Sequence, residues 1–255
     1  MKQVLQNLSS GDTYVEDVPN PQCPNDGVVI NTVQSLISSG TERMLVEFGK
    51  ANLLGKVLSQ PDKVREVANK IRTDGIATTY DAVRSKLNQP ITLGYSTVGI
   101  VSESRTKQFK PGDRVVSNGP HAETITAKPN LIARVPDNVS DEAAAFTVVA
   151  SIGLQGIRLA KPEIGECVVV IGAGLIGLLT IQMLLAQGCR VLAVDFDRKK
   201  LTLAEHYGAD TCNPQDQDLI ESSQVFSQGR GVDAVIITAS TESSSPVSQA
   251  AQMSR

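Results

Sequence analysis

Three glycines within one short turn carry the strongest chemical signal in the sequence. Gly172, Gly174 and Gly177 form a GxGxxG pattern that directly follows the apolar run 167–171 and opens an apolar stretch of helical character. In such a turn the first glycine permits a tight bend, the second lets a pyrophosphate approach the backbone, and the third lets the helix pack closely on the strand. A glycine-rich turn without a ligand is the alternative. We predict a dinucleotide-binding turn that comprises Gly172, Ala173, Gly174, Leu175, Ile176 and Gly177.

An acidic residue further along the chain indicates which dinucleotide would bind. Asp195 ends the next apolar run, roughly 20 positions after the glycine turn, where a carboxylate can accept hydrogen bonds from a ribose diol. The same carboxylate repels a ribose 2′-phosphate, so NAD(H) is favoured over NADP(H). Of the three basic residues that follow, Lys200 is expected to contact the adenosine half. Arg198 and Lys199 are expected to form the solvated start of a helix.

These residues need strands and helices in alternation to hold them in place, and the second half of the chain has that pattern. Apolar runs predict four strands, at residues 167–171, 190–195, 209–213 and 233–239. Helical patterns follow each of them, at residues 175–188, 198–208, 215–228 and 244–255. Because strands that alternate with helices form parallel sheets, we predict an α/β fold with a doubly wound parallel sheet. As part of a dinucleotide-binding sheet, its four strands would have the order 3-2-1-4.

The length of this half falls short of a complete dinucleotide-binding sheet. Such a sheet has six strands, whereas the residues from Gly172 to Arg255 suffice only for the rest of a four-stranded one. We therefore expect the sheet to be truncated at its C-terminal side and the chain to be a fragment of a longer protein. As written, it is expected to bind the adenosine half of NAD better than it performs hydride transfer.

The first half of the chain is predicted to be mainly β structure. Short runs rich in Val, Ile and Thr occur at residues 28–33, 96–101, 113–117, 123–127 and 131–135. Strands of this length and spacing are typical of a small barrel or sandwich. A helical insert at about 42–90 interrupts them, and we expect two or three helices there, the second of them between Pro61 and Gly75.

Composition excludes several classes of protein. The 255 residues carry a formal net charge of −3 and 41% of them are hydrophobic, as in an ordinary globular chain. Without a basic surplus, nucleic acid is not expected as a partner. No apolar stretch is long enough to span a membrane, and the polar N-terminus is unlike a signal peptide. The cysteines are too dispersed for a disulfide framework or a zinc ribbon, so we expect reduced thiols and a cytoplasmic location for Cys23, Cys167, Cys189 and Cys212.

Several motifs together resemble those of the medium-chain dehydrogenase/reductases, the family of alcohol-dehydrogenase-like enzymes. The motifs are LISSGTE (36–42), LGYSTVGIV (93–101), FKPGDRVVSNGPHAE (109–123), ARVPDNVSDEAAAF (133–146) and VVVIGAGLIGLLTIQ (168–182). The resemblance implies a GroES-like β-barrel catalytic domain at 1–145, followed by a Rossmann NAD-binding domain at 146–255. The insert further resembles the N-terminal part of bacterial bi-domain oxidoreductases, in which a second dehydrogenase-like domain is fused at the C-terminus.

The resemblance also shows where the chain departs from zinc-dependent relatives. In those enzymes a Cys, a His-Glu pair and a third ligand near the start of the Rossmann domain hold the metal. The corresponding positions here are Ser39, Tyr95 with Ser96, and about Val148. Neutral hydroxyls are poor zinc ligands beside thiolate and imidazole, and Val is none. We therefore predict that the chain binds no zinc.

Without a metal, another group must donate the proton to a developing alkoxide, and the resemblance suggests three hydroxyls. Tyr95 takes the position of the His ligand, Thr41 matches the proton-relay hydroxyl, and Ser39 would donate a hydrogen bond. The alternatives are a packed aromatic, a helix cap before Glu42 and a loop hydroxyl, respectively. His121 is expected to be a structural histidine, and the second histidine, His206, a surface or capping residue near a helix C-terminus.

These observations predict an NAD(H)-dependent, zinc-independent oxidoreductase. It would interconvert an alcohol and a carbonyl, or reduce an activated double bond, on a small-molecule substrate held between the two domains. The alternative is a non-catalytic NAD-binding module or an inactive fragment of a larger bi-domain oxidoreductase. Neither nucleic acid nor a membrane is expected as a partner, and a homodimer and a fused C-terminal dehydrogenase-like domain are left open.

Overall fold

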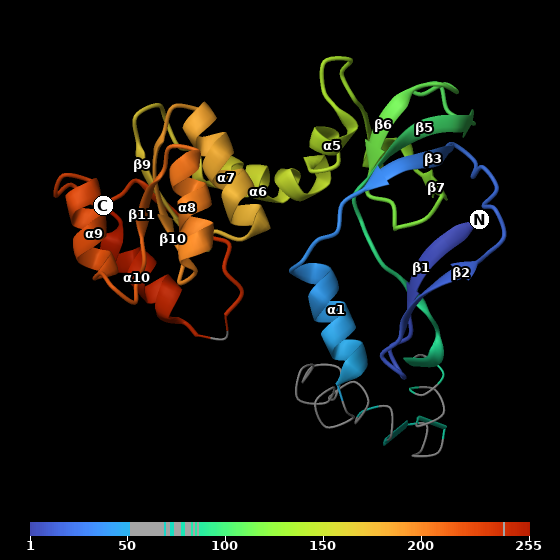
Figure 1. The fold of residues 1–255 in the computed structure, drawn as a ribbon, viewed down its shortest axis with the longest axis horizontal. Helices are drawn as coiled ribbons and strands as arrows, with labels where there is room; N and C mark the ends of the chain where they lie inside the picture. Colours follow the sequence, from blue (N-terminus) through green and yellow to red (C-terminus); the bar gives the residue numbers. More distant parts are fainter. Residues whose placement is uncertain are drawn as a thin grey trace. The chain divides into compact units, whose positions relative to one another are not determined.

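The computed structural model of the chain describes residues 1–51, 69, 72–73, 78–79, 83, 85, 87–241 and 243–255. It divides into two compact units, Met1–Val148 and Val149–Arg255 (Figure 1). Of the helices expected in the insert, the first is α1, Thr41–Lys50. Most of the second, from Pro61 to Gly75, and much of the third lie outside the described residues.

The larger sheet of the first unit contains the five strands predicted for it. These are β3 (Val28–Ser35), β5 (Thr97–Ser104), β6 (Arg114–Ser117), β7 (Thr124–Ala127) and β8 (Ile132–Arg134). They pair antiparallel in the order β7-β3-β5-β6-β8. The inward-facing Val28, Ile30, Val101, Val115 and Ile125 share one buried apolar cluster. The short runs rich in Val, Ile and Thr therefore identified these strands correctly.

A second sheet of the first unit was not expected from the sequence. It has three antiparallel strands in the order β2-β1-β4, with bounds Thr13–Asp17, Lys2–Gln6 and Ile91–Thr92. Most residues of β2 are exposed, so no buried apolar run marks this strand in the sequence. The unit also contains a short 3-10 turn at Pro129–Leu131 and the helix α5, Asp141–Ala144. Ser140 caps α5 by accepting a hydrogen bond from the Ala143 N–H.

The second unit is a parallel sheet covered by helices. Its strands are β9 (Cys167–Ile171), β10 (Arg190–Val194), β11 (Asp210–Cys212) and β12 (Ala234–Ile237). They pair in the order β11-β10-β9-β12, which confirms the predicted order 3-2-1-4. Its helices are α7 (Leu175–Ala186), α8 (Arg198–His206), α9 (Leu219–Phe226) and α10 (Ser245–Met253), and α6 (Thr147–Ala160) leads into the unit.

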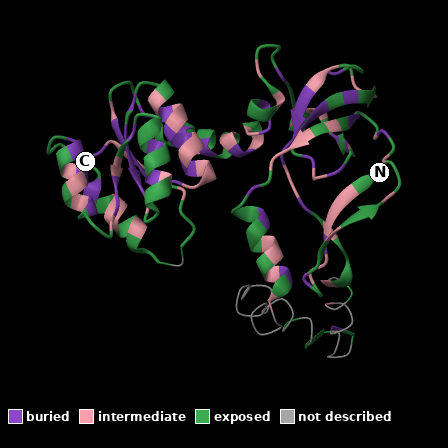
Figure 2. Ribbon diagram, viewed as in Figure 1, coloured by how far each residue is buried: buried purple, intermediate pink, exposed green. Residues whose placement is uncertain are grey.

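Both faces of this sheet are buried, as a doubly wound fold requires. Helices α7 and α8 lie on one face, and α9 and α10 lie on the other (Figure 1). Every residue of β9 is buried, which explains why its sequence CVVVI is a continuous apolar run rather than an alternating one (Figure 2). After α10 the backbone returns to the sheet, where the Val232 N–H donates to the Met253 carbonyl at 2.9 Å and the Arg255 N–H donates to the Val232 carbonyl at 3.1 Å.

Two further expectations concern the chain as a whole. All four cysteines are buried and none forms a disulfide, as predicted. Among the described residues, no helix combines the length and the apolar character that crossing a membrane requires.

Candidate functional site

The turn after β9 requires glycine at its first position. Gly172 has a φ of +100°, which side chains rarely tolerate, and its N–H donates to the Val194 carbonyl at 2.7 Å. A Cβ at this position would lie 2.7 Å from the backbone nitrogen of Ala239. The turn is therefore pressed against both neighbouring strands at their carboxyl ends, where open α/β sheets bind ligands.

The other two glycines have different surroundings. A Cβ on Gly177 would lie 1.8 Å from the Gly172 carbonyl oxygen, so only glycine lets α7 approach the strand this closely. A Cβ on Gly174 would meet no atom within 4 Å. The backbone at Gly174 thus borders open space, the arrangement that lets a phosphate approach the main chain.

The N-terminus of α7 is suited to an anion. Gly174 is its N-cap, and no side chain caps the first turn. The first N–H groups of a helix have no intrahelical partner and carry the positive end of its dipole. The half-buried residues Leu175 and Ile176 begin this turn. These backbone groups and the open space at Gly174 could accommodate a pyrophosphate.

Asp195 lies beside the glycine turn, at the end of β10. Its Oδ2 accepts a hydrogen bond from the Ala173 N–H at 2.8 Å, and its Oδ1 accepts one from the Asp197 N–H at 2.9 Å. The Lys200 Nζ is 3.6 Å from the same Oδ2. An ionised carboxylate can accept about four hydrogen bonds, so Asp195 keeps capacity for a ribose hydroxyl.

The residues after Asp195 face outward. Arg198, the first residue of α8, pairs with the exposed Asp216 at 2.8 Å, and Lys199 is exposed. The N-cap of α8 is Asp197, whose carboxylate accepts from the Lys199 N–H. His206 is the exposed last residue of the same helix, as predicted.

In the first unit, the three predicted catalytic hydroxyls are not equivalent. Tyr95 is half-buried, and its hydroxyl donates to Ser38 Oγ at 2.8 Å. Ser39 and Thr41 are exposed. The alternative reading of Thr41 as a helix cap is wrong, because Gly40 is the N-cap of α1 and no side chain caps that end. The structure therefore brings Tyr95 to Ser38 rather than to the two hydroxyls that the sequence suggested.

A buried carboxylate beside these residues was missed. Glu42 lies in the first turn of α1 and its side chain is only 8% exposed. Its Oε1 accepts from the Ser38 N–H at 2.7 Å, and its Oε2 is 2.8 Å from His121 Nε2. The other ring nitrogen of His121 is 2.8 Å from Ser35 Oγ. The sequence predicted a structural role for His121 but not its contact with the buried carboxylate of Glu42.

The local backbone holds the His121 ring in place. Gly94 has a φ of +90°, and a Cβ there would lie 2.6 Å from the Cγ of His121. The His121 N–H donates to the Leu93 carbonyl at 2.7 Å, and the His121 carbonyl accepts from the Val4 N–H at 2.9 Å. The glycine of the LGYS motif thus makes room for a histidine that lies in a different motif.

The positions that the resemblance matched to zinc ligands carry side chains that do not suit the metal. Tyr95 bonds to Ser38, and the buried Ser96 Oγ donates to the Ala145 carbonyl at 2.6 Å. Val148 has no ligating atom in its side chain. Over the described part of the chain, no group of three His, Cys, Asp or Glu side chains is placed to hold a metal ion. We therefore derive no step through a zinc ion.

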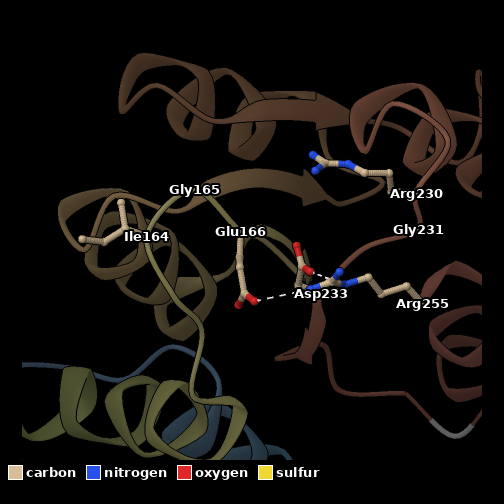
Figure 3. A pocket seen from close by; sticks show the side chains of 7 residues that line it. All are labelled: Ile164, Gly165, Glu166, Arg230, Gly231, Asp233 and Arg255. Carbon is tan, nitrogen blue, oxygen red and sulfur yellow. Dashed lines mark ion pairs between the residues drawn. The ribbon is translucent and has the colours of Figure 1, made fainter.

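A cavity of about 230 Å³ opens in the second unit, at the opposite end of the sheet from the glycine turn. Figure 3 shows the side chains around it, with Arg255 paired to Glu166 and Asp233. Those two acids precede β9 and β12, so the cavity lies at the amino ends of the strands. Ligands of parallel sheets bind at the carboxyl ends, and this cavity is therefore not part of the candidate site.

Comparison with known proteins finds similarity to dehydrogenases. A family model described as "Zinc-binding dehydrogenase" matches residues 176–254. The chain is 31% identical over 188 residues to an uncharacterized zinc-type alcohol dehydrogenase-like protein, YdjJ, of Escherichia coli, covering 60% of this chain and 54% of that protein. It is 27% identical over 174 residues to the (R,R)-butanediol dehydrogenase of Bacillus subtilis, covering 56% and 50%. The chain thus spans about half the length of the curated relatives it matches.

Solved structures show the same fold. The alcohol dehydrogenase TADH from Thermus sp. ATN1 matches with a TM-score of 0.77 and 20% identity, over 100% of this chain and 75% of that one. The galactitol-1-phosphate dehydrogenase from Escherichia coli matches with a TM-score of 0.75 and 21% identity, over 100% and 72%.

Proposed function

We propose that this chain, which belongs to the medium-chain dehydrogenase/reductases, is an NAD(H)-dependent, zinc-independent oxidoreductase. It would interconvert an alcohol and a carbonyl, or reduce an activated double bond, on a small substrate. The observation that carries the proposal is the open backbone at Gly174 beside the carboxylate of Asp195, at the carboxyl ends of β9 and β10.

The residues of the second unit would hold the cofactor. The N–H groups at the start of α7 would bind the pyrophosphate, and Asp195 would accept hydrogen bonds from the adenosine ribose. Lys200, paired with Asp195, would line the adenosine half. A carboxylate at this place favours NAD(H) over NADP(H), because it repels a 2′-phosphate. When bound, the nicotinamide would supply or accept the hydride.

The first unit would provide the proton. Tyr95 would donate its phenolic proton to the alkoxide that develops on the substrate, in the role that a metal and its relay fill in zinc-dependent relatives. Ser38 accepts the Tyr95 hydrogen bond, and the exposed Ser39 and Thr41 are proposed as neighbouring hydroxyls on the substrate side. The hydroxyl donors at the former ligand positions support zinc independence.

The proposal extends to the organisation of the protein. The first unit would be a GroES-like catalytic domain, at about residues 1–145, and the second a Rossmann domain, at about 146–255. The chain spans only about half the length of its relatives, which supports the proposal that it is part of a longer protein. We further propose that a dehydrogenase-like domain is fused to it in that longer protein, and that the protein forms a homodimer. The free, buried cysteines support a cytoplasmic location.

Isotope transfer tests the function directly. The chain is incubated with NADH deuterated at C4 and a panel of ketones, aldehydes and enones, and products are analysed by mass spectrometry. Deuterium in an alcohol or a saturated product is the expected result. It should fall by about two orders of magnitude in Tyr95→Phe and persist in the control Tyr207→Phe, whose ring lies in the other unit. NADH binding without any transfer would instead indicate a non-catalytic NAD-binding module.

A further inference from the structure

We propose that Glu42 is a positioning residue that orients the Tyr95 hydroxyl through Ser38, with His121 holding Glu42 in turn. The importance of this role for turnover rests on the proposed function of Tyr95 as the proton donor. These four residues, and Ser35 that contacts His121, all belong to the first unit.

The Ser38–Glu42 contact is reciprocal. The Ser38 N–H donates to Glu42 Oε1 at 2.7 Å, and the Glu42 N–H donates to the Ser38 carbonyl at 3.1 Å. Both residues are buried, although they stand at the edge of a largely exposed segment between β3 and α1. Two bonds in opposite directions fix the Ser38 backbone, and with it the starting point of the Ser38 side chain.

The carboxylate is itself held on its second oxygen. A buried acid needs hydrogen-bond donors to offset the loss of water, and Glu42 has one on each oxygen. Since an ionised carboxylate only accepts hydrogen bonds, His121 must carry its proton on Nε2 in this contact. The Nδ1 then accepts from the Ser35 hydroxyl when the ring is neutral, or donates to it when the ring is charged. Every polar atom of the pair is thereby satisfied.

The chain of contacts ends at the reactive group. Tyr95 donates to Ser38 Oγ, and a serine hydroxyl can both accept and donate. For Tyr95 to give its proton to a substrate alkoxide, its O–H must first turn from Ser38 Oγ towards the substrate; the phenolic O–H bond then breaks and an O–H bond forms on the substrate. The Ser38 hydroxyl, which keeps its own proton, can turn at the same time to donate a hydrogen bond to the phenolate oxygen. This exchange requires Ser38 to stay within hydrogen-bond reach of Tyr95, and Glu42 provides that constraint.

The test uses the full chain labelled with 3-fluorotyrosine. Fluorine NMR resolves the four tyrosines, and Tyr95→Phe assigns the signal of Tyr95. In Glu42→Ala we expect that signal to move towards the position of the exposed Tyr207. The kcat should fall roughly tenfold with KM unchanged, because orientation rather than binding is lost. Ser38→Ala, which leaves the backbone intact, should have the same two effects.

Conservative and matched controls make the role specific. Glu42→Gln keeps the length of the side chain and an acceptor for the Ser38 N–H. Its Tyr95 signal should therefore lie at the parent position, and its kcat should be closer to that of the parent than to that of Glu42→Ala. Glu47→Ala makes the same truncation as Glu42→Ala on the exposed face of the same helix and should change neither. If the Glu42→Ala variant does not fold, the Glu42→Asp variant replaces it, because the shorter aspartate side chain cannot keep the contacts to both Ser38 and His121.

The outcomes separate this inference from the proposed function. An unchanged Tyr95 signal in both Glu42→Ala and Ser38→Ala would overturn the positioning role, whatever the activity. If the Tyr95 signal is displaced in Glu42→Ala and Ser38→Ala but Tyr95→Phe keeps full turnover, the positioning role is supported and Tyr95 is refuted as the proton donor. A displaced Tyr95 signal with an unchanged kcat in a Tyr95-dependent enzyme would also overturn the role of Glu42 in turnover.

Discussion

The same substitution at two glycines of the β9–α7 turn should have opposite consequences. Gly177→Ala places a Cβ 1.8 Å from the Gly172 carbonyl oxygen and 2.8 Å from Thr238 Oγ1, whereas Cβ atoms in proteins essentially never come closer than 3.0 Å to another heavy atom. The obstacle is backbone, so the helix and the strand end must separate by roughly 1 Å. Overpacking costs about 1–3 kcal/mol, and with an obstacle that cannot rotate away we expect about 3 kcal/mol.

Gly174→Ala should leave the fold almost unchanged. Its Cβ meets nothing within 4 Å, and a φ of −74° with a ψ of −169° is open to alanine. The loss of a glycine N-cap costs about 1 kcal/mol or less. The methyl group, however, fills the space that a pyrophosphate needs. We expect NADH affinity to fall at least tenfold, which corresponds to about 1.4 kcal/mol.

Two measurements on each variant separate these effects. Urea unfolding followed by circular dichroism should give a clearly lower midpoint for Gly177→Ala and a midpoint close to the parent for Gly174→Ala. Titration with NADH is done without urea and at low temperature, so that the fold is intact. It should show weaker NADH binding for Gly174→Ala than for the parent chain. Parent-like NADH affinity in Gly174→Ala, or parent-like stability in Gly177→Ala, would refute the roles assigned to these residues.

Two further predictions concern pH. The backbone N–H of Lys110 and the guanidinium of Arg134 hold the pKa of Asp113 below its usual value, so its stabilising contribution is present above pH 3.8 and lost as the pH falls through the lowered value. Asp113→Asn should therefore lower the urea midpoint at pH 7, and the difference should vanish in acid; a constant difference would contradict this. Burial raises the pKa of the thiols of Cys189 and Cys212 above 9.0, with smaller contributions from nearby carboxylates. Stability should then fall as the pH rises past about 9, and both thiols should react with iodoacetamide at pH 8 much more slowly than in the unfolded chain, as measured by mass spectrometry.

The sequence was most informative where burial on both sides of a strand leaves a continuous apolar run. The buried runs at β9 and β10, the half-buried run at the edge strand β12 and the glycine turn after β9 were enough to predict the sheet and its order. Short runs rich in Val, Ile and Thr identified the five strands of the larger sheet of the first unit. Strands β1 and β2 escaped because polar residues interrupt their sequences, KQVLQ and TYVED, so no apolar run marks them.

The Ser38–Glu42–His121 network could not be predicted, for a different reason. Glu42 and His121 are 79 positions apart, and Ser38 and Tyr95 are 57 apart. Their contacts depend on how β3, α1 and the segment around Gly94 meet in space, and no local pattern encodes that. The sequence did carry one signal, a histidine next to a glycine and a proline in a chain with only two histidines.

The most direct test of the central claim, a nicotinamide dinucleotide site at Gly174 and Asp195, is a parallel titration of the chain with NADH and NADPH. We predict that NADH binds at least tenfold more tightly, about 1.4 kcal/mol. Asp195→Ala should erode this preference, and the control Asp216→Ala, which removes an exposed carboxylate paired with Arg198, should preserve it. Equal affinities for the two dinucleotides in the parent chain, or no binding of either, would contradict the account.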